Sequence, residues 1–200
     1  MLPSTSAKDR ILPVAMQLFA QQGFGTTSVA EIQKAADVRS GSFYFAYPSK
    51  NELLVAVLKA YRDGIVPMLL EPAWTGVDDP IERVFALLAV YRNLLVDSDC
   101  RYGCPIGSIA LELRDPDESI RKLLSINFLG WVEHVERCFD QAAGRLPASV
   151  KRRHLAVFVL TTMEGGVMQA RTHRTLEAFD ASVAMLRDYI DRLLTEGRPQ

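Results

Sequence analysis

The chain has 200 residues, 48% of them hydrophobic, and its formal net charge at pH 7 is −1. This hydrophobic share is enough for a packed core and excludes a largely disordered chain, while the near-zero charge excludes a generally basic nucleic-acid binder. The charge is uneven, because residues 1–50 carry five cations and three acids, a net +2, and residues 51–200 carry a net −3.

The first expected element is a helix over residues 8–22, whose apolar residues share one face and which stops at Gly23. Pro13 lies in the first two turns, where proline is tolerated. A short helix follows over residues 29–36. Ser28 and Glu31, three residues apart, form a capping box that predicts its start.

A tight turn and a second short helix come next, over residues 39–47. Asp37 tolerates the left-handed backbone that such a turn often needs, and Val38 is expected to turn inward. This layout is typical of a helix-turn-helix DNA reader, in which the N-terminal part of the second helix meets base edges. Arg39 at that end can read guanine. The alternative is a surface helical hairpin whose aromatic residues only pack.

Residues 38–50, with the sequence VRSGSFYFAYPSK, decide between these readings. Together with Gly23-Phe24, Ser28-Val29 and Leu53, they resemble the DNA-binding signature of TetR-family transcriptional regulators. The resemblance covers roughly residues 1–55 and implies a DNA-binding regulator, usually a repressor. The family usually has a basic residue where this chain has Ser40, so the alternative is a helical interaction or ligand-binding module that has lost DNA binding.

The resemblance also implies roles for single residues. Ser28, Tyr44 and Lys50 would hold phosphates, and Arg39, Ser40 and Ser42 would face bases. The whole predicted DNA-binding set is Thr27, Ser28, Arg39, Ser40, Gly41, Ser42, Tyr44, Phe45, Tyr47 and Lys50.

The rest of the chain predicts further helices and no convincing strand, so the fold class is all-α. A helix opens at Lys50 and bends or ends at Pro67, with a loop over residues 72–80. Later helices are expected over residues 80–97, 103–113, 115–143, 149–172, with Ser149 as a cap, and 176–196. We assign residues 1–52 to a three-helix DNA-binding domain and residues 53–200 to a helical effector-binding and dimerisation domain.

A dimer interface is expected on the last two helices. Apolar residues at spacings of four, three, four and three form a heptad-like stripe in the last helix: Phe179, Val183, Leu186, Ile190 and Leu193. The alternative is a stripe that faces the protein's own core. Gly165-Gly166 in mid-helix suggests close approach at this seam or beside a ligand, and we favour the seam. The resemblance implies a homodimer on palindromic DNA, with Phe158, Gly165, Gly166, Phe179, Val183, Leu186 and Ile190 at the interface.

Family members are usually released from DNA by a small molecule in the C-terminal domain. The aromatic and methionine residues predicted to contact this unknown effector are Phe85, Tyr91, Tyr102, Cys104, Phe128, Trp131, His134, Met163 and Met168. Such a lining favours an apolar or aromatic ligand. The alternative is that most of these residues are ordinary core.

Cys104 is the sharper candidate, because it lies at the start of a predicted helix, whose amides lower a thiol pKa. Cys100 is a candidate resolving thiol. The segment resembles the Gly-Cys turn of a subset of the family, some of which sense electrophiles or oxidants. The alternative is a small buried thiol, which is also our interpretation of Cys138.

No other chemistry is indicated. Three cysteines do not form a disulfide framework, and His134, His154 and His173 lack zinc-ligand spacing, so neither a metal nor a cofactor is expected. No nucleophile–base pattern supports an enzyme. No apolar run approaches the roughly 20 residues of a membrane span, and residues 1–7 do not form a secretory signal, so we expect a cytoplasmic protein without a membrane partner.

Overall fold

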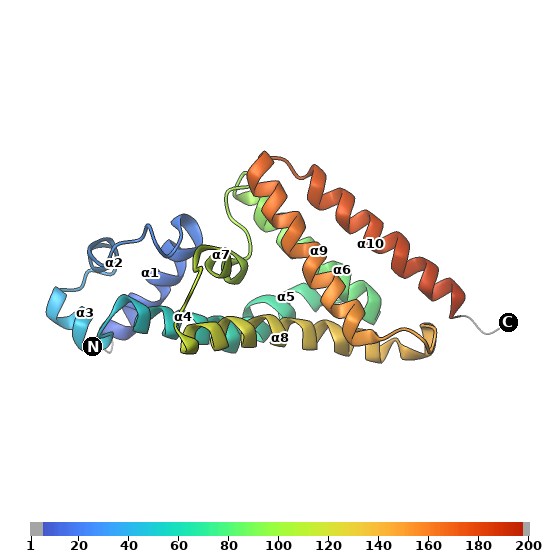
Figure 1. The fold of residues 1–200 in the computed structure, drawn as a ribbon, viewed down its shortest axis with the longest axis horizontal. Coiled ribbons are helices and arrows are strands. Elements are labelled where there is room, and N and C mark those ends of the chain that lie inside the picture. Colours follow the sequence, from blue (N-terminus) through green and yellow to red (C-terminus); the bar gives the residue numbers. More distant parts are fainter. Residues whose placement is uncertain (1–5, 198–200) are drawn as a thin grey trace. The chain divides into compact units, whose positions relative to one another are not determined.

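The computed structural model describes residues 6–197, and Figure 1 shows them as helices joined by short loops. No strand occurs over these residues, and the predicted all-α fold class is confirmed. The elements are α1 (Ala7–Gln22), α2 (Val29–Ala35), α3 (Ser40–Ala46), α4 (Lys50–Ile65), the π-helix η1 (Val66–Leu70), α5 (Glu71–Trp74), α6 (Pro80–Asp97), α7 (Pro105–Glu112), α8 (Glu118–Gln141), the 3₁₀-helix η2 (Ala143–Arg145), α9 (Arg152–His173) and α10 (Glu177–Glu196). None of these described helices is long and apolar enough to cross a membrane.

Side-chain caps set the starts of the first two helices. At α2, the Glu31 amide donates to Ser28 Oγ at 3.1 Å, and the Ser28 amide donates to Glu31 Oε2 at 2.7 Å. Ser6 and Asp9 make the same reciprocal pair at α1, with distances of 3.2 and 3.1 Å. Each pair satisfies two backbone amides that a helix start leaves without partners. The capping box predicted at Ser28 is confirmed.

The segment after α4 differs from the expectation. Helix α4 ends at Ile65, two residues before Pro67, as expected, but no loop opens there, because η1 and α5 continue the helical path. Pro67 and Pro72 occupy the first turns of η1 and α5, where a missing N–H costs least. The loop expected over residues 72–80 is therefore restricted to residues 75–79.

The start of α9 also differs from the expectation. Ser149 does not cap this helix, because α9 begins at Arg152 and Lys151 occupies the N-cap position without a side-chain cap. An ion pair to α8 holds the first turn instead, with Arg153 NH1 2.8 Å from Glu136 Oε2. A tertiary contact therefore replaces the local cap that the sequence suggested.

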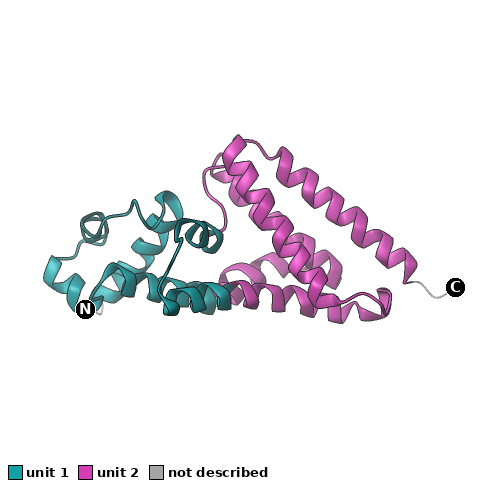
Figure 2. Cartoon of the chain, viewed as in Figure 1, with its two compact units in different colours: residues 1–63, 105–127 teal, residues 64–104, 128–200 magenta. Residues whose placement is uncertain are grey.

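The chain forms two compact units, which Figure 2 colours separately. Unit 1 comprises residues 1–63 and 105–127, and unit 2 comprises residues 64–104 and 128–200. The sequence predicted one boundary, after residue 52. Unit 1 contains more residues than the predicted DNA-binding domain. One reason is that α7, which is distant in sequence, packs against α1.

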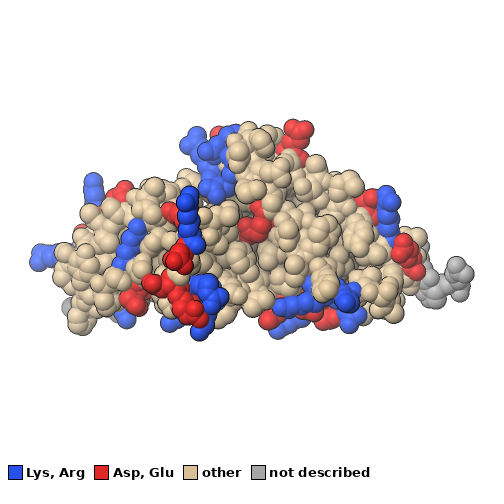
Figure 3. Space-filling view, in the orientation of Figure 1, with Lys and Arg blue, Asp and Glu red and all other residues tan. Residues whose placement is uncertain are grey.

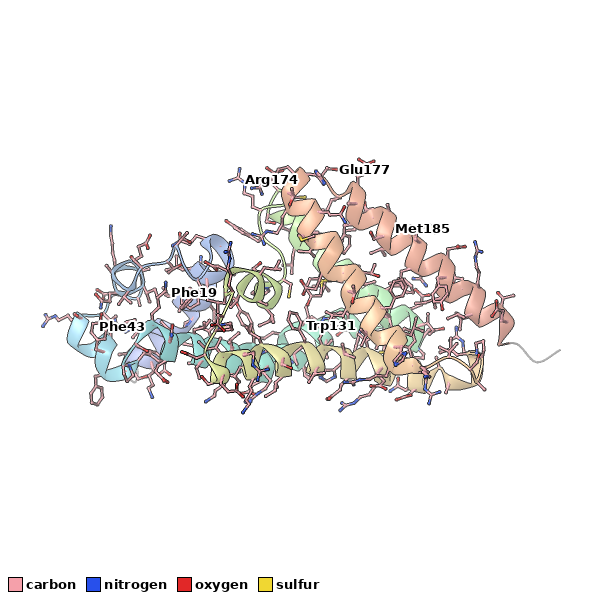
Figure 4. All side chains as sticks on the ribbon, viewed as in Figure 1. Phe19, Phe43, Trp131, Arg174, Glu177 and Met185 are labelled. Carbon is pink, nitrogen blue, oxygen red and sulfur yellow. The ribbon has the colours of Figure 1, made fainter. Side chains whose placement is uncertain are left out.

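Unit 1 is organised around α1, which packs against α2, α3 and α7. The apolar stripe of α1 is buried, with Ile11, Ala15 and Phe19 withdrawn from solvent. Phe43 of α3 is also buried, and Figure 4 labels both Phe19 and Phe43 within unit 1. The core of unit 1 therefore fixes α3 through its inner face and leaves its outer face available.

In unit 2, α9 and α10 lie side by side (Figure 1). Gly166 allows this approach, because a Cβ there would lie 2.9 Å from the Phe179 ring and 3.2 Å from its Cα on α10. Arg92 on α6 also holds α10, donating to both carboxylate oxygens of Asp180 at 2.8 and 2.9 Å. Gly166 thus has a role within one chain, whereas a Cβ on Gly165 would have no neighbour within 4 Å.

Most of the stripe predicted as a dimer seam faces the interior of its own chain. Four members are buried, while Val183 is half-buried; the buried ones are Phe179, Leu186, Ile190 and Leu193. These side chains pack inside unit 2, so the core-facing alternative is correct for the four buried residues. The neighbouring surface of α10 exposes Met185 and Tyr189 instead.

Candidate nucleic-acid interface

A left-handed residue makes the turn between α2 and α3. Asp37 has a φ angle of 51°, as its position in the predicted turn required. The Val38 amide donates to the Gln33 carbonyl at 3.0 Å and closes the turn. Arg10 of α1 donates from NH1 to the Asp37 carbonyl at 2.7 Å. The direction in which α3 leaves α2 is therefore set by backbone geometry and by α1.

Helix α3 has one buried face and one exposed face. Phe43 and Ala46 pack inward, and the rings of Phe43 and Tyr44 meet edge to face at 5.3 Å. Phe45, in contrast, is 93% exposed. An aromatic side chain so fully exposed adds little to the core and makes α3 a candidate contact surface.

The outer side of α3 also carries the polar groups predicted to read DNA. Arg39, Ser40, Gly41, Ser42 and Tyr44 are all exposed. Arg39, Ser42, Arg10 and Lys34 line a polar groove along α1, α2 and α3. Figure 3 shows separate Lys and Arg side chains at this end of unit 1 rather than a continuous basic face. Cations in such a groove suit phosphate, and the α3 side chains suit base edges.

Three residues of the predicted DNA-binding set are buried or bound within unit 1. Thr27 is fully buried and its hydroxyl donates to the Gly23 carbonyl at 2.6 Å, while Tyr47 is buried in the core. The Lys50 ammonium donates to the Phe24 carbonyl and lies 4.2 Å from the centre of the Phe24 ring. Burial and these intramolecular contacts remove the three side chains from our DNA-facing set, whereas Ser28 and the exposed residues of α3 stay in it.

The residues predicted to contact an effector all belong to unit 2. Phe85, Tyr91, Cys104, Trp131 and Met163 are buried, while Tyr102, Phe128 and His134 are half-buried. Met168 is the exception, because half of its surface is exposed on α9. We therefore drop Met168 from the interior set.

A buried polar cluster lies among these residues. Trp131 Nε1 donates to the Tyr91 hydroxyl at 3.2 Å, and burial raises the pKa of Tyr91 well above its usual value, with the Cys104 thiolate charge adding to the shift. Burial also raises the pKa of Glu164, although a hydrogen bond with Cys104 opposes this. Glu164 Oε1 is buried without a hydrogen-bond partner. Sequence reasoning missed Glu164, although a single acid between Met163 and Gly165 was a usable signal.

The loop that ends at Cys104 is unusual in its backbone. Asp99 and Cys100 have φ angles of 51° and 53°, which side-chain-bearing residues rarely adopt. Arg174 NH1 donates to the Cys100 carbonyl at 2.8 Å and holds the loop. Cys138 lies elsewhere on α8, and burial raises the pKa of its thiol to about 11, in line with the inert role expected for it.

Comparisons with known proteins identify the chain. Residues 11–57 match the family model for bacterial regulatory proteins of the tetR family. Residues 80–185, more than half of the chain, match the model for the C-terminal domain of LmrA/YxaF-like transcriptional regulators. The chain belongs to the TetR family of transcriptional regulators.

Individual relatives are distant but cover nearly the whole chain. An uncharacterised HTH-type transcriptional regulator of Mycobacterium tuberculosis is 27% identical, over 92% of this chain and 93% of the relative. The HTH-type transcriptional repressor DhaR of Mycobacterium sp. strain GP1 is 24% identical, over 88% of each protein. A structure of a cysteine mutant of the TetR-family regulator CifR with 26-base-pair operator DNA has a TM-score of 0.76, at 24% identity over 94% of this chain and 98% of CifR.

As a TetR-family member, the chain is a DNA-binding transcriptional regulator and not an enzyme. The family assignment matches the resemblance carried by residues 38–50. It rules out the alternative that α2 and α3 form a surface helical hairpin whose aromatic residues only pack. The family model for the DNA-binding part ends at residue 57, within α4.

Proposed function

We propose that this regulator is a cytoplasmic homodimer that represses transcription by binding a palindromic operator, and that a small electrophilic or apolar effector releases it. The observation that carries the proposal is the exposed face of α3, where Phe45 and the predicted polar readers point away from the unit 1 core. The similarity to DhaR, a transcriptional repressor, supports repression as the sign of regulation.

The chemistry of α3 suits the major groove. The N-terminal part of a recognition helix meets base edges, where Arg39 can pair with guanine and Ser42 with several bases. Phe45 is fully exposed and apolar, which suits contact with a thymine methyl group. Ser28, exposed at the start of α2, and Tyr44, exposed on α3, carry hydroxyl groups that suit phosphates.

Dimerisation is supported by the outer surface of α9 and α10. Met185 is 67% exposed, and Phe158 and Tyr189 are each 47% exposed with their rings in edge-to-face contact at 6.1 Å. Figure 3 shows a broad uncharged area over these helices. A two-fold dimer through this surface would present two α3 helices to half-sites about 34–36 Å apart.

The effector proposal rests on the cluster around Cys104. A thiol at the start of a helix, hydrogen-bonded to Glu164, is placed to add to a small α,β-unsaturated carbonyl compound. A sulfur–carbon bond forms at the β-carbon, the carbon–carbon π bond breaks, and the thiol proton ends on the α-carbon. The bulk of the adduct would disturb a buried site, which is the expected signal for release.

Selection of bound sequences from random duplex DNA tests the central claim. We expect recovery of one palindrome, and light scattering should report a dimer. Arg39→Ala should weaken binding of that palindrome roughly 10- to 100-fold, the range expected for loss of one base-reading arginine. Arg137→Ala, which removes an exposed cation from unit 2, is the control and should bind normally. A folded protein that selects no sequence would contradict the proposal.

Alkylation tests the effector. The parent protein and Cys138→Ser should lose operator binding after treatment with a small Michael acceptor, with one adduct seen by mass spectrometry. Cys104→Ser should keep binding. Release of Cys104→Ser at the same reagent concentration would show that the signal enters elsewhere.

A further inference from the structure

The loop between α1 and α2 holds a carboxylate that comes from α7. The Phe24 amide donates to Glu112 Oε2 at 2.8 Å, and the Gly25 amide donates to Glu112 Oε1 at 2.5 Å. Two successive backbone N–H groups that point at one anion form a small anion-binding cradle. Here the anion is the side chain at the last residue of α7, 87 residues further along the chain from Gly25.

Glycines make room for this carboxylate. Gly23 has a φ angle of 91°, and a Cβ there would lie 3.2 Å from Glu112 Oε2. A Cβ on Gly25 would lie only 2.6 Å from Glu112 Oε1. The sequence predicts Gly23 as the stop of a helix, but the structure gives both glycines a second role, which is to let the Glu112 carboxylate reach the backbone.

Lys50 holds the same loop by its carbonyl groups. Its ammonium donates to the carbonyls of Phe24 and Gly25, so the two residues are bound through both their N–H and C=O groups. Burial lowers the pKa of Lys50, while the nearby charges of Glu112 and Glu31 act in the opposite direction. We call this arrangement, made of Glu112, Lys50 and residues 23–25, the loop clamp.

The loop clamp lies directly before the DNA-facing helices. Residues 26–28 connect it to α2, and the Thr27 hydroxyl ties this connection back to the Gly23 carbonyl. Ser28 then caps α2 and is itself a predicted phosphate contact. A shift of the clamped loop would therefore displace the start of α2.

At its other end, α7 is connected to the candidate effector site. Cys104 directly precedes Pro105, the first residue of α7, and Glu112 is the last residue of that eight-residue helix. We propose that Glu112 is a positioning residue for operator binding, and that α7 transmits a change at Cys104 to the DNA reader by loosening the loop clamp. The second part rests on the proposed effector site, whereas the first requires only DNA binding.

The first experiment compares Glu112→Leu and Glu112→Gln with the parent. Leucine has no acceptor, so we expect affinity for the parent's selected operator to fall about tenfold. Glutamine keeps one carbonyl oxygen for one of the two amides and should recover part of that loss. Asp115→Asn is the matched control, because it removes the same charge from the loop after α7 without touching the clamp, and it should bind normally.

Amide hydrogen exchange supplies a readout that does not depend on DNA. In folded Glu112→Leu, the Phe24 and Gly25 amides should exchange about tenfold faster than in the parent. If exchange and operator affinity both stay at the parent values, the positioning role is wrong. If the parent selects no operator, the proposed function fails, while faster exchange would still support the clamp and unchanged exchange would overturn it.

The same exchange measurement tests the link to Cys104. Alkylation of the parent at Cys104 should speed exchange of the Phe24 and Gly25 amides, and Cys104→Ser treated in the same way should show no change. Alkylated parent protein that releases its operator but keeps slow exchange at both amides would overturn transmission through α7.

Discussion

Two loops linked through α7 are built in opposite ways: the loop after α1, which Glu112 at the end of α7 holds, and the loop that leads into α7. The loop after α1 places a glycine, Gly23, at its positive φ angle and is held by a carboxylate. The loop before α7 places Asp99 and Cys100 in the left-handed region and is held by Arg174. Non-glycine residues in that region cost free energy, on the order of 1 kcal/mol or more each.

The difference separates two ways of fixing a loop. The loop after α1 has a relaxed backbone, and its position depends on the side chains of Glu112 and Lys50. The loop before α7 stores backbone strain and depends on Arg174, the residue after α9, to maintain it. We expect the strained loop to rearrange when its contacts change, and the relaxed loop to follow its clamp.

The largest expected effect is in the strained loop. In Gly103→Ala, the new Cβ would collide with the Val167 side chain, whose β-branched rotamer on α9 has little freedom to move. We expect the free energy of unfolding to fall by about 1–3 kcal/mol in a denaturant titration. Gly165→Ala is the control, since its Cβ meets nothing within 4 Å and should be neutral or stabilising.

Unfolding free energies of Glu164→Gln and the parent, measured across pH, test the buried acid that is hydrogen-bonded to Cys104 at the end of this loop. Burial raises the pKa of Glu164, so the stability contributed by its neutral form is present below its unfolded pKa and lost as pH rises through the folded pKa. The amide of the variant stays neutral, so the parent should lose stability relative to the variant as the pH rises above the usual glutamate pKa of 4.5. If the difference in stability between the variant and the parent were the same at every pH, Glu164 would not be a buried neutral acid.

For the relaxed loop, Gly25→Ala should have a moderate effect. Its Cβ would displace the flexible end of Glu112 rather than rigid backbone, so the main loss is the hydrogen bond to the Gly25 amide. We expect a loss of about 1 kcal/mol in unfolding free energy. Gly41→Ala, with nothing within 4 Å of its Cβ, should not show this loss.

The smallest expected effect is a gain in the free energy of unfolding. Asp99→Gly removes the side chain that disfavours φ of 51°, and we expect stabilisation of about 0.5 kcal/mol after the added freedom of the unfolded chain is counted. Asp97→Gly, at the last residue of α6, should have the opposite sign. If Asp99→Gly and Asp97→Gly lowered the free energy of unfolding equally, the backbone at Asp99 would store no strain.

Local signals carried most of what the sequence predicted correctly. Ser28 with Glu31 marked the start of α2, and Asp37 marked the turn, because caps and left-handed turns depend on a few neighbouring residues. Pro67 correctly marked the end of α4 at Ile65, but it did not reveal that η1 follows, because a proline in a first turn is compatible with helical backbone.

The remaining features depend on contacts between distant segments. Phe179 and Ile190 have the spacing of a seam, but only packing decides whether such a stripe faces its own core or a partner. The burial of Tyr47 and the role of Glu112 likewise follow from how other helices pack. The family signature gave the function, whereas the position of each DNA-facing side chain required the fold.

The engagement of Lys50 also bears on how affinity should respond to ionic strength. Each cation that neutralises a DNA phosphate releases condensed counterions and steepens the fall of log affinity with log salt by about 0.9. Lys50 is bound to the carbonyls of its own chain and should add little to this slope. A count of sequence cations would therefore overstate the salt dependence, and Lys50→Gln should lower affinity through the loop while leaving the slope nearly unchanged.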